Sequence, residues 1–290
     1  MLVGFDGGDR SEDALALGQL LATALPAPLV VGTVFDHPEI DPEGPLATAA
    51  REQAEQTAAA AAARCAPQAG HRICQDHSPA QGLERIAATT AADLIVVGSS
   101  HRGPLGRVLA GSVPEQLVHG AVAAVAVAPA GYARERRELR NLGAAFDGSA
   151  EGREALALAL QLGRRANANL RVLRVAGAHA ATLVANPFTA AQSQRYVEEV
   201  RAREERMARD AVDALGGTPA SIEVRIGEAV SALAGSAGEL DLLLLGSRAY
   251  GTVRRVLSRS VSTHLLRDLP CPLLILPRRG VPTSTPAPAA

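Results

Sequence analysis

The most restrictive feature of this sequence is that it repeats itself once. Phe5-Asp6-Gly7 returns as Phe146-Asp147-Gly148, 141 residues further along the chain. Later, the apolar run that ends in Gly98-Ser99 returns as a run that ends in Gly246-Ser247, and the offset has grown to 148 residues. Self-similarity of this kind indicates two copies of one structural unit. The length of 290 residues agrees, since most domains hold about 100–200 residues.

The repeat also sets the expected domain boundaries. We expect one domain over residues 1–130, a linker over 131–139 and a second domain over 140–278. The linker is charged and flanked by proline and glycine, as linkers commonly are. The growing offset places about seven extra residues in the second domain, which we assign to a long charged helix near 193–215. Residues 279–290, rich in proline, threonine and alanine, are expected to form a disordered tail.

Within each copy, short apolar runs alternate with helical patterns. In the first copy, Ser11 and Ser78 are the expected N-caps of two helices, and Pro79 follows the second cap directly. Apolar strands that alternate with helices are typical of a parallel sheet covered on both faces. We therefore expect two tandem doubly wound α/β domains, with ligands bound outside the carboxyl ends of the strands. The expected strands of the first copy lie near residues 2–5, 29–35, 72–75, 94–97 and 124–128, and its helices near 11–24, 46–65, 78–88 and 112–119.

Composition excludes several classes of function. All 29 basic residues are arginine, so the chain has no lysine for a P-loop, a Schiff base or a kinase strand. A net charge of -1 and the scarcity of aromatic residues argue against nucleic-acid binding. No apolar stretch is long enough to span a membrane, and no signal peptide is visible. The three cysteines form no CxxC motif, which predicts a cytoplasmic location, and no histidine spacing predicts a metal site.

Two glycine-containing turns follow expected strands, at the ends where such sheets bind ligands. One is Asp6-Gly7-Gly8, and the other is the long loop from Gly98 to Gly111, which leads to a helix beginning at Ser112. Free backbone N–H groups and the dipole at a helix start attract phosphate, and Ser112 can add a hydroxyl donor. Arg107 and His101 can add positive charge. Asp6 can accept hydrogen bonds from sugar hydroxyls. Together these residues predict a nucleotide site, although glycine turns can also serve only to connect strands to helices.

The loop resembles the signature of the universal stress protein family, which reads Gly, two residues, Gly, nine residues, then Gly-Ser or Gly-Thr. Here Gly98 fills the first position and Gly111-Ser112 the last, with nine residues between position 101 and Gly111. Phe5-Asp6-Gly7 resembles the turn that follows the first strand in this family. The likeness extends over both copies. It implies a Rossmann-like sheet of strand order 3-2-1-4-5 in each domain, with helices on both sides.

The resemblance also implies a ligand. Members of the ATP-binding branch of the family hold ATP between the first-strand turn, the end of the second strand and the signature loop. We therefore expect ATP, alone or with Mg²⁺, in the first domain. Carried over by position, the nucleotide-binding residues are Asp6, Val34, Gly98, Ser100, His101, Gly103, Arg107, Gly111, Ser112 and Val113.

Both copies depart from the family pattern. In the first copy the middle glycine of the signature is His101. The Cβ of His101 could oppose ATP binding, because it disfavours a backbone with φ > 0 or crowds the phosphates. Alternatively, the imidazole of His101 donates a hydrogen bond to a phosphate. The second copy departs further, and we expect its site to be weak or silent. The residues of that degenerate second site are Asp147, Gly246, Ala249, Arg259 and Ser260.

These observations predict a nucleotide-binding, regulatory stress-response protein. We expect it not to be an enzyme, with very slow ATP hydrolysis at most, because no nucleophile or general base can be assigned. One alternative is a protein-interaction module of the same fold, and another is an adenylating or α-hydrolase-type enzyme. The apolar fifth strands, near 124–128 and 273–276, are expected to pair within the chain as an internal pseudo-dimer. We keep two further alternatives for its partners: a homodimer of whole chains and an unidentified protein.

Overall fold

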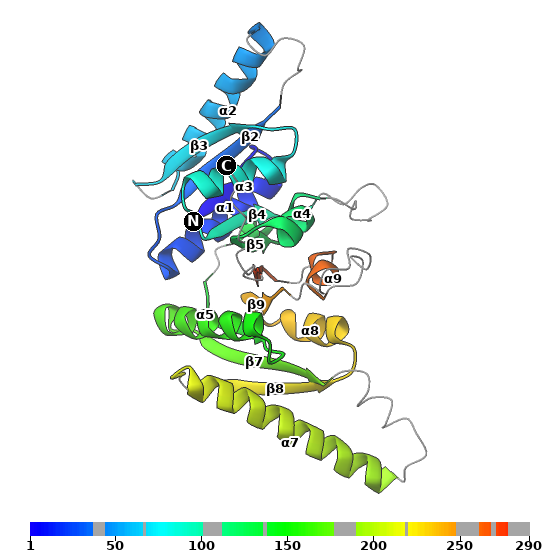
Figure 1. Ribbon diagram of the computed structural model, residues 1–290. Helices are drawn as coiled ribbons and strands as arrows, with labels where there is room; N and C mark the ends of the chain where they lie inside the picture. Colours follow the sequence, from blue (N-terminus) through cyan, green and yellow to red (C-terminus); the bar gives the residue numbers. More distant parts are fainter. Residues whose placement is uncertain are drawn as a thin grey trace, which may run out of the picture.

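The computed structural model describes residues 1–36, 44–65, 68–100, 112–135, 138–176, 190–217, 220–247, 261–267 and 271–277. These residues form one ten-stranded sheet of order β3-β2-β1-β4-β5-β10-β9-β6-β7-β8 (Figure 1). Read from either edge inward, each half of the sheet has the order 3-2-1-4-5, and within each half the strands run parallel. The expected fold, two tandem doubly wound units, is therefore confirmed.

The first half contains the strands and helices that the sequence pattern predicts. Its helices α1 and α2 pack on one face of the sheet and α3 and α4 on the other. A short 3₁₀ turn, Tyr132–Arg134, follows its last strand. The strands are β1 (Leu2–Gly4), β2 (Val30–Phe35), β3 (Gly70–Gln75), β4 (Leu94–Gly98) and β5 (Ala124–Ala128), and the helices are α1 (Asp9–Ala24), α2 (Pro45–Ala63), α3 (Pro79–Thr89) and α4 (Val113–Gly120).

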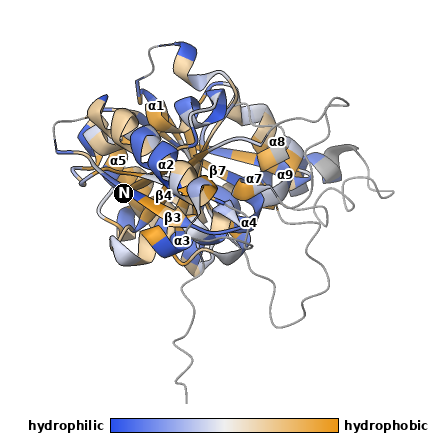
Figure 2. Cartoon of the chain, turned by 90° about the horizontal axis from the view of Figure 1, so that it is seen from above, coloured by the Kyte–Doolittle hydropathy of each residue, from blue (hydrophilic) through white to orange (hydrophobic). Residues whose placement is uncertain are grey.

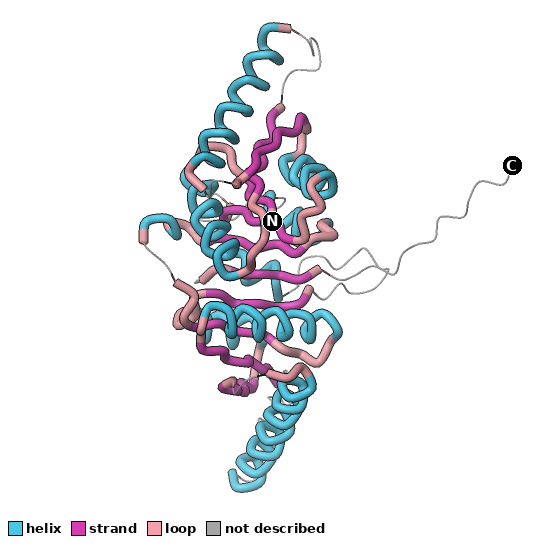
Figure 3. The backbone as a smooth tube through the Cα atoms, turned by 90° about the vertical axis from the view of Figure 1, so that its left-hand side faces the viewer, coloured by secondary structure: helices cyan, strands magenta, loops and turns pink. Residues whose placement is uncertain are grey.

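The second half repeats this arrangement. Its helix α7 has 25 residues where the equivalent α2 has 19, so most of the extra residues lie where the sequence placed them. The helices α2 and α7 extend beyond the sheet at opposite ends of the molecule (Figures 1 and 3). The strands are β6 (Asn141–Ala145), β7 (Asn169–Ala176), β8 (Ser221–Ile226), β9 (Leu242–Gly246) and β10 (Leu273–Leu276), and the helices are α5 (Ala150–Ala166), α7 (Ala190–Ala214), α8 (Ala229–Ala237) and α9 (Val261–Arg267).

The two halves meet through their fifth strands. β5 and β10 pair antiparallel, with Val125 opposite Ile275 and Val127 opposite Leu273. This is the internal contact that the sequence predicts. Both strands are buried, because α4 and α9 cover one face of the joint and α1 and α5 the other. Apolar residues accordingly gather at the centre of the molecule, where the helices face the sheet (Figure 2).

The residues expected to form a linker begin as a packed turn. Asp13 of α1 is 3% exposed, and its carboxylate accepts hydrogen bonds from the backbone N–H groups of Gly131 at 2.8 Å and Ala133 at 2.9 Å. Gly131 has φ +78, a left-handed conformation that glycine adopts without strain. The chain leaving β5 is therefore fixed against α1 before it enters the second half.

The expected cap of the first helix is wrong. Helix α1 begins at Asp9 with Gly8 as its N-cap, and Ser11 lies inside the first turn, where its hydroxyl donates to the Gly8 carbonyl at 2.8 Å. The helix begins early because Gly7, at φ +86, turns the chain sharply after β1. The cap at Ser78 is confirmed, since its hydroxyl accepts a hydrogen bond from the N–H of Gln81. None of the described helices is long and apolar enough to cross a membrane.

Candidate functional site

A pocket of about 640 Å³ opens at the carboxyl ends of β1, β2 and β4. Helices α1, α3 and α4 complete its walls. This is the place where doubly wound sheets bind their ligands, and the volume lies within the range of small-molecule sites. The lining residues are Gly4, Phe5, Asp6, Arg10, Ser11, Gly32, Val34, Pro79, Leu83, Val97, Gly98, Ser99, Ser100, Ser112, Val113 and Pro114.

The pocket brings together every predicted site residue of the first half that the structure describes. They come from four separate segments of the chain, which the sheet order places side by side. The remaining predicted residues of this site, His101, Gly103, Arg107 and Gly111, lie outside the described residues. The predicted residues that line the pocket are Asp6, Val34, Gly98, Ser100, Ser112 and Val113.

Asp6 presents a carboxylate at the mouth of the pocket. Its Oδ1 accepts a hydrogen bond from the N–H of Gly8 at 2.9 Å, which fixes the side chain in the turn. Its Oδ2 accepts no hydrogen bond from the described residues, and Asp6 is exposed. The side chain can therefore accept a hydrogen bond from a ligand hydroxyl without losing its own anchor.

Two glycines form the floor of the pocket. Gly4 of β1 pairs with Gly32 of β2 in the sheet, and both would point a side chain toward α3. A Cβ on Gly4 would lie 2.9 Å from Leu83 Cδ1, and one on Gly32 would lie 2.8 Å from Leu2 Cδ1. Neither position therefore has room for a side chain, and Leu83 packs closely over this part of the sheet, where it lines the pocket together with the two glycines.

Gly98 has a packing role of its own. A Cβ at this position would lie 2.0 Å from the carbonyl oxygen of Arg10, so the first turn of α1 rests directly on the end of β4. Gly246 makes the same close approach in the second half, where a Cβ would lie 2.5 Å from the backbone carbon of Glu151. The first glycine of the signature is thus required for helix-to-strand packing in both halves, whether or not a ligand is bound.

Helix α4 begins at the pocket. Ser112 is its N-cap residue, and the Ser112 hydroxyl makes no capping hydrogen bond to the helix. Val113 and Pro114 follow in the first turn and line the pocket. The backbone N–H groups at such a start favour anions. Among the described residues, no group of histidine, cysteine, aspartate or glutamate is arranged to hold a metal ion.

The predicted set did not include several lining residues. Arg10 is the clearest, because it is the only cationic side chain among the described residues that line the pocket. It is 27% exposed, and its Nη1 lies 3.7 Å from Oδ2 of the buried Asp13. The signature does not mark it, since it belongs to α1. Pro79 and Leu83 of α3 were also missed, because no local pattern shows which face of a helix meets a ligand.

The second half differs at the equivalent positions. Ala145 and Leu173 pair where Gly4 and Gly32 pair in the first half, and Leu173 is buried at 2% exposure. Its side chain lies on the face of the sheet toward which a side chain on Gly32 would point. Of the predicted degenerate-site residues, Asp147 and Gly246 are described, whereas Ala249, Arg259 and Ser260 lie outside the described residues.

The carboxylate and the charge at this second site also differ. Asp147 Oδ1 accepts hydrogen bonds from both the N–H of Ser149, at 2.8 Å, and its hydroxyl, at 2.5 Å. Ser149 stands where the first half has Gly8, so the carboxylate is engaged more fully. Glu151 stands where the first half has Arg10, because both rest on the equivalent glycine. The sign of the charge at this position is therefore reversed.

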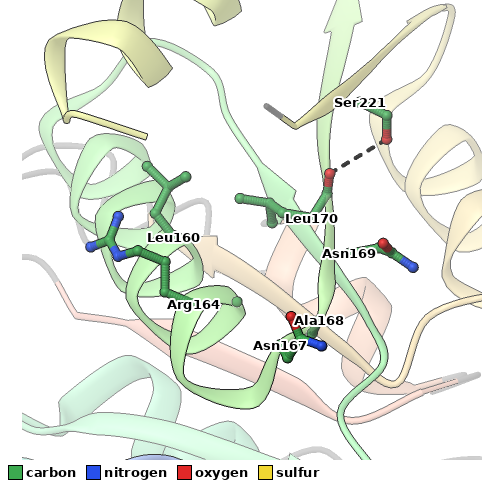
Figure 4. A pocket seen from close by; sticks show the side chains of 8 residues that line it. Leu160, Arg164, Asn167, Ala168, Asn169, Leu170 and Ser221 are labelled. Carbon is green, nitrogen blue, oxygen red and sulfur yellow. Dashed lines mark hydrogen bonds between the residues drawn. The ribbon is translucent and has the colours of Figure 1, made fainter. Parts of the chain in front are cut away.

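A second hollow, of about 650 Å³, lies in the second half but at the amino ends of β7 and β8. Figure 4 shows its side chains, with the Ser221 hydroxyl donating to the Leu170 carbonyl at 3.4 Å. It contains none of the predicted site residues. It also lies at the end of the strands where doubly wound sheets do not usually bind ligands. The pocket at Asp6 is therefore the candidate functional site.

The fold and the pocket define a doubly wound α/β protein with a pocket at the carboxyl ends of its strands. Comparison with known sequences identifies the family. The sequence model of the Universal stress protein family matches residues 1–129 and again residues 138–277. The chain belongs to the universal stress protein family, and it carries the family domain twice.

Two individual relatives match nearly the whole chain, and a third, single-domain one aligns with less than half of it. A universal stress protein of Mycobacterium tuberculosis is 25% identical over 302 aligned positions, which cover 96% of this chain and 99% of the relative. The crystal structure of a universal stress protein from Archaeoglobus fulgidus covers 97% of this chain and 98% of its own, with 18% identity and a TM-score of 0.67. A universal stress protein solved in complex with cAMP covers 45% of this chain and 96% of its own, with 24% identity and a TM-score of 0.34.

Proposed function

We propose that this protein is a regulatory protein that binds ATP, alone or with Mg²⁺, in the pocket of its first half. The observation that carries the proposal is the pocket itself. In a single space of about 640 Å³ it combines a side-chain-free apolar floor, an anchored carboxylate and the start of a helix. These three parts suit a base, a ribose and a phosphate chain respectively.

Each part has a residue to perform it. The base would lie on Gly4 and Gly32 beside Leu83, near Val34 at the end of β2. Asp6 would accept a hydrogen bond from a ribose hydroxyl through Oδ2. The phosphates would lie toward Ser112, whose hydroxyl and neighbouring N–H groups can donate to them. None of these contacts requires lysine, which the chain lacks.

We further propose that the second half does not bind a nucleotide. Leu173 fills the floor, Ser149 engages Asp147, and Glu151 places a negative charge where a phosphate-binding site needs a positive one. The expected stoichiometry is therefore one ATP per chain. The second half would then serve as structural support and as the partner of β5.

A regulatory role fits the pocket better than a catalytic one. Asp6 is the only acidic side chain among the described lining residues, and neither histidine nor cysteine lines the pocket there. The described residues thus provide no paired acid and base for proton transfer. We propose that the protein acts in the cytoplasm, in keeping with its three free cysteines, and that ATP hydrolysis is very slow at most.

Calorimetric titration of the full chain with ATP and with ATP plus Mg²⁺ tests the proposal. We expect one site per chain, and thermal unfolding should shift by the equivalent of about 2.7 kcal/mol when ATP exceeds its Kd 100-fold. Asp6→Ala should weaken binding, whereas the matched variant Asp147→Ala should not. If millimolar ATP does not bind, the result would favour the alternative function, a protein-interaction module of the same fold. Two equal sites would contradict the asymmetry, and rapid ADP production lost in Asp6→Ala would indicate an enzyme.

A further inference from the structure

On the basis of the nucleotide-binding function proposed above, we propose that Arg10 determines the charge selectivity of the pocket. Arg10 makes the first half select phosphate-bearing nucleotides over uncharged nucleosides. Glu151, at the same place in the second half, excludes such anions. The two residues thus set the asymmetry between the halves, in addition to the changes in the floor of the pocket.

The position of Arg10 is fixed by the backbone. It lies in the first turn of α1, and its carbonyl oxygen packs against Gly98 so closely that a Cβ on Gly98 would lie 2.0 Å away. Gly98 is itself a lining residue at the end of β4. Arg10 therefore stands between the turn that carries Asp6 and the strand that leads into the signature loop, where the phosphates of a bound nucleotide would lie.

Arg10 is also held in place electrostatically without being neutralised fully. Its Nη1 lies 3.7 Å from Oδ2 of Asp13, a separation too long for a strong hydrogen bond. The two oxygens of Asp13 already accept hydrogen bonds from the N–H groups of Gly131 and Ala133. Among the described residues, none accepts a short hydrogen bond from the Arg10 guanidinium, and its side chain is 27% exposed.

The second half provides a natural charge reversal at the same position. Glu151 packs against Gly246 as Arg10 packs against Gly98, since a Cβ on Gly246 would lie 2.7 Å from Glu151 Cβ and one on Gly98 would lie 2.9 Å from Arg10 Cβ. The side chains of Arg10 and Glu151 therefore leave their helices from equivalent places. A ligand that carries phosphate therefore meets a guanidinium at this position in the first half and a carboxylate in the second.

The test compares ligands that differ only in charge. The dissociation constants of ATP and adenosine are measured by calorimetry for the wild-type full chain, Arg10→Gln and Arg10→Glu. We expect Arg10→Gln to weaken the affinity for ATP about tenfold, equivalent to about 1.4 kcal/mol, and Arg10→Glu to weaken this affinity more. The affinity for adenosine should stay unchanged within error in both variants. Arg10→Lys should retain part of the ATP affinity, and Arg153→Gln, at an exposed position of α5, is the matched control with unchanged affinity for both ligands.

Each other outcome contradicts a defined statement. Equal weakening of ATP and adenosine would show that Arg10 only supports the fold of the pocket, and unchanged ATP affinity in Arg10→Glu would show that the charge is supplied elsewhere. Either result overturns the assignment of Arg10 while the nucleotide site stands. Wild-type protein that binds neither ligand would overturn the proposed function itself. If the Arg10→Gln protein does not fold, Arg10→Met takes its place in the comparison, because methionine keeps the apolar part of the side chain and removes the charge.

Discussion

The guanidinium of Arg174 on β7 is paired with the carboxylate of Glu204 on α7, inside the second half of the molecule. Arg174 Nε donates to Glu204 Oε2 at 2.9 Å, and the side chains are only 6% and 15% exposed. The same guanidinium lies 5.2 Å from the centre of the Phe146 ring and donates to the Phe146 carbonyl at 3.3 Å. In the first half the equivalent residue is Thr33, whose hydroxyl donates to the Phe5 carbonyl at 2.7 Å. The second half thus supports the turn after its first strand with a buried ion pair.

Removing one partner of this pair should destabilise the protein strongly. Glu204→Ala leaves the Arg174 charge buried without its carboxylate, which costs about 3 kcal/mol of the free energy of unfolding. Urea unfolding at neutral pH measures the loss. Glu199→Ala, at an exposed position of the same helix, is the control and should change stability by less than about 0.5 kcal/mol. A loss in Glu204→Ala as small as in the control would place the pair among weak surface ion pairs.

Gly98→Ala should destabilise the first half, because the new Cβ would lie 2.0 Å from the Arg10 carbonyl oxygen and the backbone has to shift. We expect a loss of about 2 kcal/mol and weaker ATP binding. Gly235→Ala is the matched control, since its Cβ would meet nothing within 4 Å and alanine is a better helix former. That variant should be neutral or slightly more stable. A Gly98→Ala protein with wild-type stability and binding would show that α1 does not rest on β4 as described.

Stability should fall in acid partly through Glu12 and Glu228. The hydrogen bond from Arg64 lowers the pKa of Glu12, and the N–H groups of Ser231 and Val230 lower the pKa of Glu228. A carboxylate with a lowered pKa in the folded state adds stability above its unfolded pKa, about 4.3, and this contribution is lost as pH falls through the lower folded value. The wild-type unfolding free energy should therefore decrease below about pH 4.3.

Two variants identify these groups in the acid transition. Glu12→Gln should be less stable than wild type at neutral pH, and its stability should depend less on pH between about pH 5 and 3. The loss at neutral pH should stay below about 1 kcal/mol, since the side chains of Arg64 and Glu12 are 52% and 36% exposed. Glu52→Gln, at an exposed position of α2, should follow the wild-type curve. A Glu12→Gln protein with an unaltered pH slope would contradict the role of this pair.

The cysteines should differ in reactivity toward thiol reagents. Burial raises the pKa of Cys271 to about 12, and the residue is 2% exposed. The pKa of Cys74 is also raised by burial, but Cys74 is only partly buried on the edge strand β3. Alkylation followed by mass spectrometry should label Cys74 in the folded protein and Cys271 only after unfolding. Labelling of Cys271 at the same rate as Cys74 in folded protein would mean that the β9–β10 region opens readily.

Much of the fold and part of the site could be predicted because their signals are local or repeated. The duplication and the strand pattern predicted two doubly wound units, the family resemblance implied the strand order, and the signature predicted pocket residues such as Gly98 and Ser112. The start of α1 was mispredicted because nothing in the sequence shows that Gly7 adopts φ +86. Arg10 was missed because its place in the pocket depends on the approach of α1 to β4, which joins segments that are distant in sequence.

The floor of the pocket was missed for a similar reason. Gly4 and Gly32 matter as neighbours across two strands, and their pairing follows from sheet register rather than from any motif. The replacement of Gly32 by Leu173 in the second copy is equally invisible until β6 and β7 are aligned on β1 and β2. The predicted loss of the second site was based on residues in its loop, whereas the described differences lie in the strands and in the first turn of α5.

The antiparallel pairing of β5 with β10 has an evolutionary consequence. When two identical chains meet at such a contact, every substitution appears in both partners at once. Here both partners belong to one chain, so each molecule holds one of each half in fixed proportion. A change such as Gly to Leu in one floor then leaves the other floor untouched. Covalent fusion thus gives the two halves freedom to diverge independently of each other.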